Sequence, residues 1–473
     1  MATTSGEIIG RAQKAAALFK KIDQAKTDRI VRAIYLSMMD NRVRLAKMAV
    51  EESGLGVWQH KVIKNVIASQ LVYEDIKNRK TAGIISENQF SGIIELAQPI
   101  GPILALIPVI SPTATTIFKI LISMKTRNPV IISSSAMVKN CVAETARACY
   151  EAALKIGAPE HCIQWLTKPN PLKTKELMSH HGLSLILATG TGELVKASYS
   201  SGTPTIGVGS GNVPAYIGSS ADIPFAVQSI LMSKTFDNGS ICASEQAVVV
   251  KKETAPPVIA EFKRQKAHFL SAEEIEKVSS IAYDKEQGTM KTGVVGQSVQ
   301  RIAELAGIKV AADTSVLIAR LDQVSREQPL SSEILAPILA FYVEDTFESA
   351  IERCAEIARF GGVGHTAVIY SNSPERIEYF SEAIDVARLL VNTPSTHGAL
   401  GGMFNTLTPS FTLSCGSGGK NGTTDNISTS HLLNIHRICR RRVNERWKSV
   451  SDSKYLDDSL TGEEMEREFN KNT

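Results

Sequence analysis

Apolar and polar positions follow two different periods along the chain. Up to about Lys80, stretches such as "DRIVRAIYLSMMDNRVRLAKMAVEES" place apolar residues at the spacing of one helix face. From Gly101 onward short apolar runs take over, and each is followed by a longer segment with helical spacing. The pattern predicts amphipathic helices first and a series of strand–helix units after them.

The strand–helix units form two series. In the first, the expected strands are "GPILALIPV", "NPVIISS", "CIQWL", "LSLILATG" and "TPTIGVG", and the expected helices are "PTATTIFKILISMK", "VAETARACYEAALKIG", the segment around "TKELMSHH" and "ELVKASYSS". After Lys234 the second series contains "QAVVVK", "SVLIARL", "TAVIYS" and "ARLLVN" as strands. Apolar strands joined by helices predict an α/β fold with parallel sheets covered on both faces, and such sheets bind ligands at the carboxyl ends of their strands.

These changes in pattern suggest where the domains end. We expect a first α/β domain over residues 1–234 and a second over residues 235–403. A glycine- and threonine-rich return segment, residues 404–445, and a charged tail, residues 446–473, follow. The tail is low in apolar residues, so we expect it to be helical at first and frayed at its end.

Composition excludes several classes of protein. With 473 residues, 43% of them hydrophobic and 21% charged, and a net charge of +4, the chain is typical of a globular protein and carries too little charge to indicate nucleic acid. The seven cysteines show no CxxC spacing, so no metal site and no disulfide framework is expected. No secretory signal and no uncharged run of transmembrane length is seen. We therefore expect a soluble, cytoplasmic protein with reduced thiols and no membrane partner.

One cysteine lies in a setting that suggests chemistry. Cys242 follows the turn formers of "FDNGSICASEQ" and precedes the apolar run "AVVV". A buried structural thiol is the ordinary interpretation of a free cysteine. A position at the mouth of a strand, however, would present a thiolate to a ligand.

Two turns at strand ends suggest phosphate or ribose contacts. The strand "LSLILA" runs into Thr189, Gly190 and Gly192 and then into a helix, which is the arrangement of a dinucleotide-binding turn without its third glycine. A tight strand-to-helix turn is the alternative. The earlier turn "SSSAMVK", with Ser133 at its start and Lys139 at its end, supplies hydroxyls and a cation, although a solvated loop fits it equally well.

Taken together, these segments resemble a known family. "KILISMKTRNPVIIS", "ATGTGELVKASYSSGTPTIGVGSGN", "FDNGSICASEQ", "SSEILAPIL", "GVGHTAVIY" and "CGSGGKN" occur in the order seen in CoA-acylating aldehyde dehydrogenases, and most closely in the aldehyde-oxidising half of bifunctional aldehyde-alcohol dehydrogenases. The resemblance covers about residues 5 to 445. It implies two Rossmann-like domains, the first binding NAD and CoA and the second carrying the nucleophile. It also implies a small β extension near residues 84–100 and after Met403, through which subunits pair into a homodimer or a larger homo-oligomer.

The resemblance implies that Cys242 is the nucleophile. Its thiolate would add to an aldehyde, and loss of hydride to the nicotinamide would leave an enzyme thioester that CoA then cleaves. In hydrolytic members of the superfamily, a glutamate at the position of Gly207 activates water. Water has a pKa of about 15.7 and needs a base, whereas an alkyl thiol has a pKa of about 8.5. Gly207 therefore favours CoA over water as the acyl acceptor.

Further roles follow from the same resemblance. Glu333 matches the glutamate that binds the nicotinamide ribose, with an exposed helix-start acid as the alternative. Gly190, Gly192 and Gly209 would allow close approach of the cofactor and CoA. His365 in "GHT" would steer or deprotonate the CoA thiol, and a structural histidine is as good an interpretation.

Two departures from the family pattern leave the substrate open. Relatives usually carry Asn where this chain has Ser111, which can alter contacts to the aldehyde or the oxyanion. They commonly carry Trp where it has Gly418, and loss of an indole is expected to open or reshape the pocket. Acetaldehyde is the first expectation, with a semialdehyde or a sulfonated aldehyde as alternatives, and NAD as the cofactor with NADP as an alternative.

Three further questions stay open in the sequence. A hydrolytic enzyme and a non-catalytic scaffold are the alternative functions, and the charged tail is the one hint of recruitment to a partner enzyme or a bacterial microcompartment. The chain stops soon after the half that resembles the family, so reduction to an alcohol would be expected to need another protein.

Overall fold

The computed structural model describes residues 4–471, and these form two compact units. The first comprises the chain up to Arg79 together with Pro99–Leu433, and the second comprises Lys80–Gln98 together with the chain from Asn434. No helix within residues 4–471 combines the length and the apolar character needed to cross a membrane.

The first unit contains a five-stranded parallel sheet in the order β5-β4-β3-β6-β7. Its strands are β3 (Ile103–Ile107), β4 (Val130–Ser134), β5 (Ile163–Trp165), β6 (Leu185–Thr189) and β7 (Thr205–Val208). The helices of this part are α1 (Ser5–Phe19), α2 (Gln24–Ser53), α3 (Trp58–Val66), the π-helical η1 (Ile67–Leu71), α4 (Val72–Ile76), α5 (Pro112–Lys125), the 3-10 turn η2 (Ala136–Val138), α6 (Lys139–Lys155), α7 (Pro171–Met178) and α8 (Gly192–Tyr199).

Both faces of this sheet are covered, as the apolar strands predict. Successive side chains of a strand point to opposite faces. Ile103 and Ala105 accordingly pack in an apolar cluster with residues of α2, α5 and α6, whereas Leu104 and Leu106 pack with residues of α1, α7 and α8. This double burial explains why β3 reads as an unbroken apolar run. Its neighbours are β4 and β6, and β7 pairs with β6; because these strands are parallel, their carboxyl ends lie at one edge, where ligands bind in such sheets.

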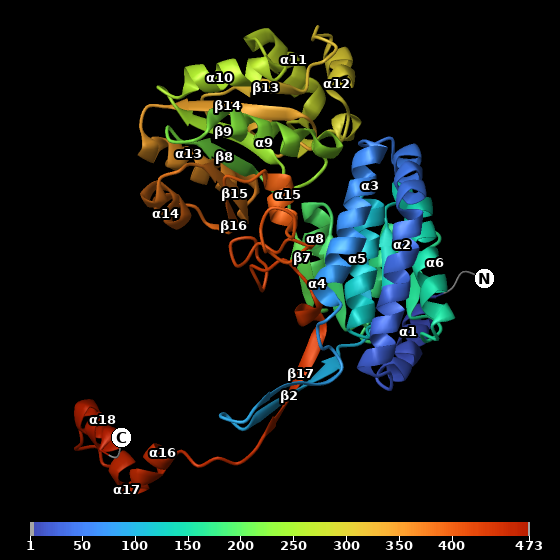
Figure 1. Ribbon diagram of the computed structural model, residues 1–473, viewed down its shortest axis with the longest axis vertical. Helices are drawn as coiled ribbons and strands as arrows, with labels where there is room; N and C mark the ends of the chain where they lie inside the picture. The colour runs from blue at the N-terminus through green and yellow to red at the C-terminus, as the bar shows by residue number, and fades with distance from the viewer. Residues whose placement is uncertain (1–3, 472–473) are drawn as a thin grey trace. The chain divides into compact units, whose positions relative to one another are not determined.

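A seven-stranded parallel sheet, also in the first unit, has the order β10-β13-β14-β9-β8-β15-β16. Its strands are β8 (Val213–Ile217), β9 (Glu245–Lys251), β10 (Ala267–Phe269), β13 (Val316–Arg320), β14 (Ile338–Glu344), β15 (Gly364–Tyr370) and β16 (Val386–Val391). Figure 1 shows β14, β9 and β8 side by side. Because β8 pairs with β9 and β15, the chain enters this sheet before residue 235, earlier than the expected domain boundary.

Helices and short turns surround the seven-stranded sheet. They are α9 (Ile223–Thr235), η3 (Phe236–Gly239), α10 (Ala255–Arg264), α11 (Ala272–Ala282), η4 (Thr292–Val294), α12 (Val299–Ala306), η5 (Pro329–Ser331), α13 (Phe347–Gly361), α14 (Pro374–Ala383) and α15 (Ser395–Leu400). The 3-10 turn η6 (Thr429–Leu432) contacts α5 instead. A hairpin of β11 (Tyr283–Asp284) and β12 (Thr289–Met290) follows α11. Helices α9, α11, α14 and α15 are additional to those that the sequence pattern predicts.

The second unit holds a three-stranded sheet in the order β1-β2-β17 and the tail. Its elements are β1 (Gly83–Asn88), β2 (Ile93–Pro99), β17 (Leu433–Cys439), α16 (Glu445–Ser449), α17 (Asp452–Tyr455) and α18 (Gly462–Asn470). The tail end, which we expected to fray, carries α18 instead. The reason is local, because Thr461 and Glu464 form a capping box that satisfies backbone N–H groups at the start of this helix.

Candidate active site

The segment before Cys242 is a tight turn with an uncommon backbone. Asp237 and Asn238 both have φ of 53°, and Gly239 has φ of 70°. Asp, Asn and Gly are the residues that adopt this left-handed region most readily. A Cβ at Gly239 would lie 2.8 Å from the carbonyl oxygen of Ala336, so the turn is also closely packed. It leaves Cys242 half-buried, just before the start of β9.

His365 lies beside this cysteine. Its Nε2 is 3.3 Å from Cys242 Sγ, and its Nδ1 is 2.9 Å from Thr366 Oγ1. Arg388 on β16 donates from Nε to Thr366 Oγ1 at 3.3 Å and from Nη2 to the His365 carbonyl at 2.9 Å. With its proton on Nδ1, where Thr366 accepts it, the imidazole turns the lone pair of Nε2 toward the sulfur.

Both groups of this pair are neutral at rest. Burial, assisted by the charge of Glu333, raises the pKa of the Cys242 thiol to about 12. Burial, assisted by the Arg388 guanidinium, lowers the pKa of His365 to about 3. The pair is therefore a thiol facing a neutral imidazole, and the thiolate must form when substrate is present.

Glu333 is linked to Cys242 and His365 through Gly211, which lies in the loop between β7 and β8. The Gly211 N–H donates to Glu333 Oε1 at 3.0 Å. A Cβ at Gly211 would lie 2.2 Å from the Cys242 carbonyl oxygen and 3.1 Å from His365 Cγ, so this close approach requires glycine. Burial raises the pKa of Glu333 to about 7. The structure thus brings together three of the predicted residues, Cys242, His365 and Glu333.

Gly207 is buried on β7 with no room for a side chain. A Cβ there would lie 2.8 Å from Val195 Cγ1 and 3.0 Å from Tyr199 Cε2, both on α8. The Gly207 N–H donates to the Tyr199 hydroxyl at 3.0 Å, and Asn421 Nδ2 donates to the same oxygen at 2.7 Å. A glutamate at this position would collide with α8.

The turn after β6 leaves open backbone around two of the predicted glycines. Gly192 is the first residue of α8, and Gly209 follows β7; a Cβ on either would meet no atom within 4 Å. Gly190, in contrast, packs against Leu194, which would lie 3.0 Å from its Cβ. Thr189 Oγ1 lies 3.3 Å from Thr412 Oγ1. A bound group can therefore approach the backbone at Gly192 and Gly209, next to the positive end of a helix.

Ser133 and Lys139 lie apart from Cys242. Ser133 is buried, and its hydroxyl is 2.9 Å from Thr174 Oγ1. Lys139 is exposed at the start of α6. Within residues 4–471, neither forms a hydrogen bond with Cys242, His365 or Glu333; Ser133 lies in β4 and Lys139 begins α6, so both belong to the edge of the five-stranded sheet.

Ser111 is connected to the turn before Cys242 through Lys64, a residue that the sequence did not single out. Its Oγ accepts a hydrogen bond from Lys64 Nζ at 3.0 Å, and Lys64 also donates to the Ser240 carbonyl at 3.0 Å. The sequence signal for Lys64 was slight, a pair of lysines three residues apart in "HKVIKN" on one helix face. Thr366 and Arg388, which orient His365, carried no sequence signal.

Gly418 does not border open space. A Cβ there would lie 2.8 Å from Val363 Cγ1 and 3.1 Å from Asp385 Oδ2. Val363 and Asp385 therefore occupy the space next to Gly418 in which a side chain would begin. The pocket opening that we expected from the loss of the indole is not seen here.

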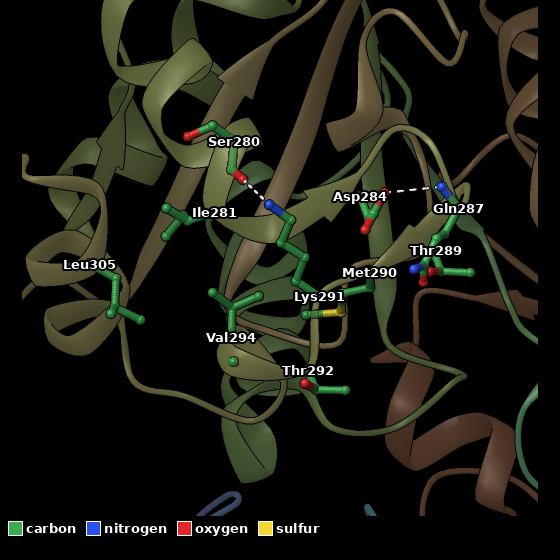
Figure 2. A pocket seen from close by; sticks show the side chains of 11 residues that line it. Ser280, Ile281, Asp284, Gln287, Thr289, Met290, Lys291, Thr292, Val294 and Leu305 are labelled. Carbon is green, nitrogen blue, oxygen red and sulfur yellow. Dashed lines mark hydrogen bonds between the residues drawn. The ribbon is translucent and has the colours of Figure 1, made fainter.

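A cavity of about 650 Å³ lies elsewhere in the first unit, beside α11 and the β11–β12 hairpin (Figure 2). Figure 2 shows Lys291, whose Nζ donates to the Ser280 carbonyl at 2.9 Å. None of the predicted site residues lines this cavity. Its lining offers no nucleophile–base pair, so the site around Cys242 is the stronger candidate.

Comparison with known proteins gives a consistent result. A family model described as "Aldehyde dehydrogenase family" matches residues 2–406. The bifunctional aldehyde-alcohol dehydrogenase AdhE of Escherichia coli K12 is 41% identical over 453 residues, which are 95% of this chain and 51% of that protein. The chain thus spans about half the length of the first curated relatives it matches.

Two further proteins are similar over nearly their whole length. The succinate-semialdehyde dehydrogenase (acetylating) of Clostridium kluyveri is 36% identical, with 91% of this chain and 94% of that protein aligned. The crystal structure of an acetylating aldehyde dehydrogenase from Geobacillus thermoglucosidasius has a TM-score of 0.91 and 42% identity, and it covers 93% of this chain and 97% of that one.

Proposed function

This chain belongs to the aldehyde dehydrogenase family, and we propose that it is a CoA-acylating member, which oxidises a short-chain aldehyde with NAD and CoA to acyl-CoA and NADH, reversibly. The observation that carries the proposal is Gly207. In hydrolytic members a glutamate at this position activates water, whereas here Val195 and Tyr199 fill the space of any side chain. Acetaldehyde is the first substrate to test, because bifunctional aldehyde-alcohol dehydrogenases are among the most similar relatives.

The first step is attack by Cys242. A bond forms between Sγ and the carbonyl carbon, the carbonyl electron pair moves to oxygen, and the thiol proton leaves toward His365 Nε2, which lies 3.3 Å from the sulfur. With a pKa of about 3, the imidazole does not retain this proton, which ends on the former carbonyl oxygen, so that the adduct is a neutral thiohemiacetal. The neutrality of the imidazole leaves its lone pair available over the whole physiological pH range.

The described residues fit a bound dinucleotide. Open backbone at Gly192 and Gly209, the start of α8 and the carboxylate of Glu333 would hold it. When bound, the nicotinamide accepts the hydride that converts the Cys242 adduct into a thioester. NAD is the proposed form.

The thioester is then cleaved by the CoA thiol rather than by water. A thiol ionises to a few per cent at neutral pH, whereas water needs a base beside it. His365 faces the sulfur and can take the proton of an incoming thiol by the same geometry. The remaining nearby carboxylate, Glu333, is held by Gly211 and has a pKa of about 7, so a large part of it is protonated at neutral pH.

The test is NADH formation from acetaldehyde and NAD with and without CoA. We expect steady turnover with CoA and, without it, a single burst of at most one NADH per subunit. Gly207→Glu should not introduce hydrolysis, because its side chain would collide with Val195 and Tyr199; it should instead lower the melting temperature. Steady turnover of the parent without CoA would overturn the proposal and point to Glu333 as the base for water.

We also propose that copies of this chain associate through the sheet β1-β2-β17. β1 and β17 are its edge strands, and an open edge pairs readily with another strand. Ile84 is 53% exposed and Phe90 is 91% exposed, which suits a surface covered by a second copy. Sedimentation velocity should show a dimer or larger species that dissociates in the Ile84→Asp, Phe90→Asp double variant. Leu456→Asp, on the tail, is the control and should leave the species unchanged; a monomeric parent would contradict the proposal.

A further inference from the structure

Two lysines and one aspartate form a buried group behind the turn that carries Cys242, and the reaction scheme above does not use them. Lys61 and Lys64, one helical turn apart on α3, are 1% and 0% exposed, and Asp237 is 0% exposed. Asp237 Oδ2 lies 2.9 Å from Lys61 Nζ and 2.5 Å from Lys64 Nζ. Its other oxygen accepts from the Val57 N–H at 2.7 Å.

The two lysines differ in what else they contact. Lys61 Nζ donates to the Ile110 carbonyl at 3.0 Å, away from the nucleophile turn. Lys64 Nζ donates to the Ser240 carbonyl, two residues before Cys242, and to Ser111 Oγ at the start of α5, each at 3.0 Å. Lys64 therefore joins α3, α5 and the nucleophile turn through one ammonium group.

The group carries more positive than negative charge. Burial opposes the ionisation of Asp237, but the ammonium groups of Lys64 and Lys61 outweigh it and hold the pKa of this carboxyl below its usual value. Burial lowers the pKa of Lys64 to about 8, against the attraction of Asp237, so most of it is protonated at neutral pH. Two ammonium groups then face one carboxylate, and a buried surplus charge acts on its surroundings at low dielectric.

The positive charge of Lys64 interacts electrostatically with Cys242. The interaction of Lys64 with Cys242 favours the protonated amine, and by reciprocity the protonated amine favours the thiolate. The other groups facing Cys242 are Glu333 and Cys415, which oppose ionisation of the thiol, and Arg388 and His365. Lys64 itself faces Asp237, Lys61 and His60.

We propose that Lys64 is a positioning residue for Cys242: its ammonium fixes the Ser240 carbonyl and the Ser111 hydroxyl in place, and its charge stabilises the thiolate that attacks the substrate. The inference rests on the proposed function in that it takes Cys242 as the nucleophile. It adds a buried residue that acts through Cys242 and sets the fraction of this cysteine present as thiolate.

The test follows alkylation of Cys242 by iodoacetamide from pH 6 to 7.5, because only the thiolate reacts and because Lys64, with its pKa of about 8, is mostly protonated over this range. Labelling is quantified on the peptide containing Cys242, since Cys439 is exposed and reacts as well. In Lys64→Met we expect the alkylation rate at each pH to fall at least about tenfold, equivalent to a rise of about one unit in the thiol pKa. Lys64→Gln, which keeps a donor for the Ser240 carbonyl but no charge, separates charge from hydrogen bonding and should show the same fall.

Two further variants complete the design. Lys64→Arg keeps the charge and should recover most of the alkylation rate even if the melting temperature stays low. Lys125→Met removes another buried lysine, whose Nζ lies 2.5 Å from Asp28 Oδ1 at the far end of α5, and should lower the melting temperature without changing the alkylation rate.

A merely structural role gives a different result. If Lys64→Met or Lys64→Gln lost thermal stability yet was alkylated within about twofold of the parent rate, the inference would be overturned. The readout uses no aldehyde, no NAD and no CoA, so it stands or falls separately from the proposed reaction. A parent enzyme that turned over without CoA but showed the tenfold fall in alkylation would contradict the function and support the role of Lys64.

Discussion

Replacing Cys242 by alanine is expected to abolish CoA-dependent NADH formation, with kcat falling by about 10⁴-fold or more. No other described cysteine has a histidine nitrogen within hydrogen-bond distance of its sulfur: the remaining thiols are buried or, in the case of Cys439, exposed on β17. Without the sulfur there is no covalent adduct, so neither oxidation nor acyl transfer can proceed. The measurement is steady-state NADH formation from acetaldehyde, NAD and CoA.

Controls separate loss of chemistry from loss of structure. Cys242→Ala removes one atom from a half-buried position, so the melting temperature should stay near that of the parent. Cys439→Ala, which removes the exposed thiol, should retain full activity. Substantial CoA-dependent turnover by Cys242→Ala would mean that another group is the nucleophile, and the assignment of this site would fail.

The second large effect is expected from His365→Ala, which should lower kcat by about 10²- to 10³-fold. The imidazole Nε2 is the acceptor for the Cys242 proton, and the alanine leaves the thiol, with its pKa of about 12, facing no base. The measurement is the pH profile of kcat/KM for the parent and the variant, in both directions of the reaction.

The shape of the pH profile of kcat/KM tests the pKa values assigned to the groups around Cys242. Since the pKa of His365 lies at about 3, protonation of this imidazole should not limit the parent rate near pH 6.5. Ionisation of Glu333, with a pKa of about 7, and of Lys64, with a pKa of about 8, should account for inflections near neutrality, and these inflections should persist in His365→Ala. A parent inflection near pH 6.5 that vanished with His365 would show that the imidazole titrates in the ordinary range.

The lowered pKa of His365 also makes the free energy of unfolding depend on pH. An unfolded chain binds a proton at His365 below about pH 6.5, while the folded chain does so only below about pH 3. The folded state therefore loses stability as pH falls through this window, and part of that loss should be absent in His365→Ala. Thr366→Val would be the milder variant, since it removes the hydroxyl 2.9 Å from Nδ1 but keeps the imidazole.

Much of the fold was readable from local pattern. The stretch "PTATTIFKILISMK" was predicted as a helix, and α5 spans Pro112–Lys125, the same residues. Apolar runs gave all the strands of the five-stranded sheet, and in the seven-stranded sheet they gave β9, β13, β15 and β16 but not β8, β10 or β14. A strand buried on two faces has no polar side to display, which is why such runs are visible in the sequence. Cys242 and Glu333 could be singled out from motifs, since a polar turn before a strand and a short family signature are visible in consecutive residues.

The sequence by itself therefore determined the α/β class and the family and pointed to Cys242 as the nucleophile that we propose, because each depends on residues that are near one another in the chain. Only the tertiary structure decided how the strands pair and which distant side chains become neighbours. Strand β8 joined the second sheet through pairing with β9 and β15, and α8 closed the space beside Gly207. Lys64 and Asp237, 173 positions apart, became partners only on folding. The effect of a buried charge depends on the groups that surround it, and no local pattern encodes those neighbours.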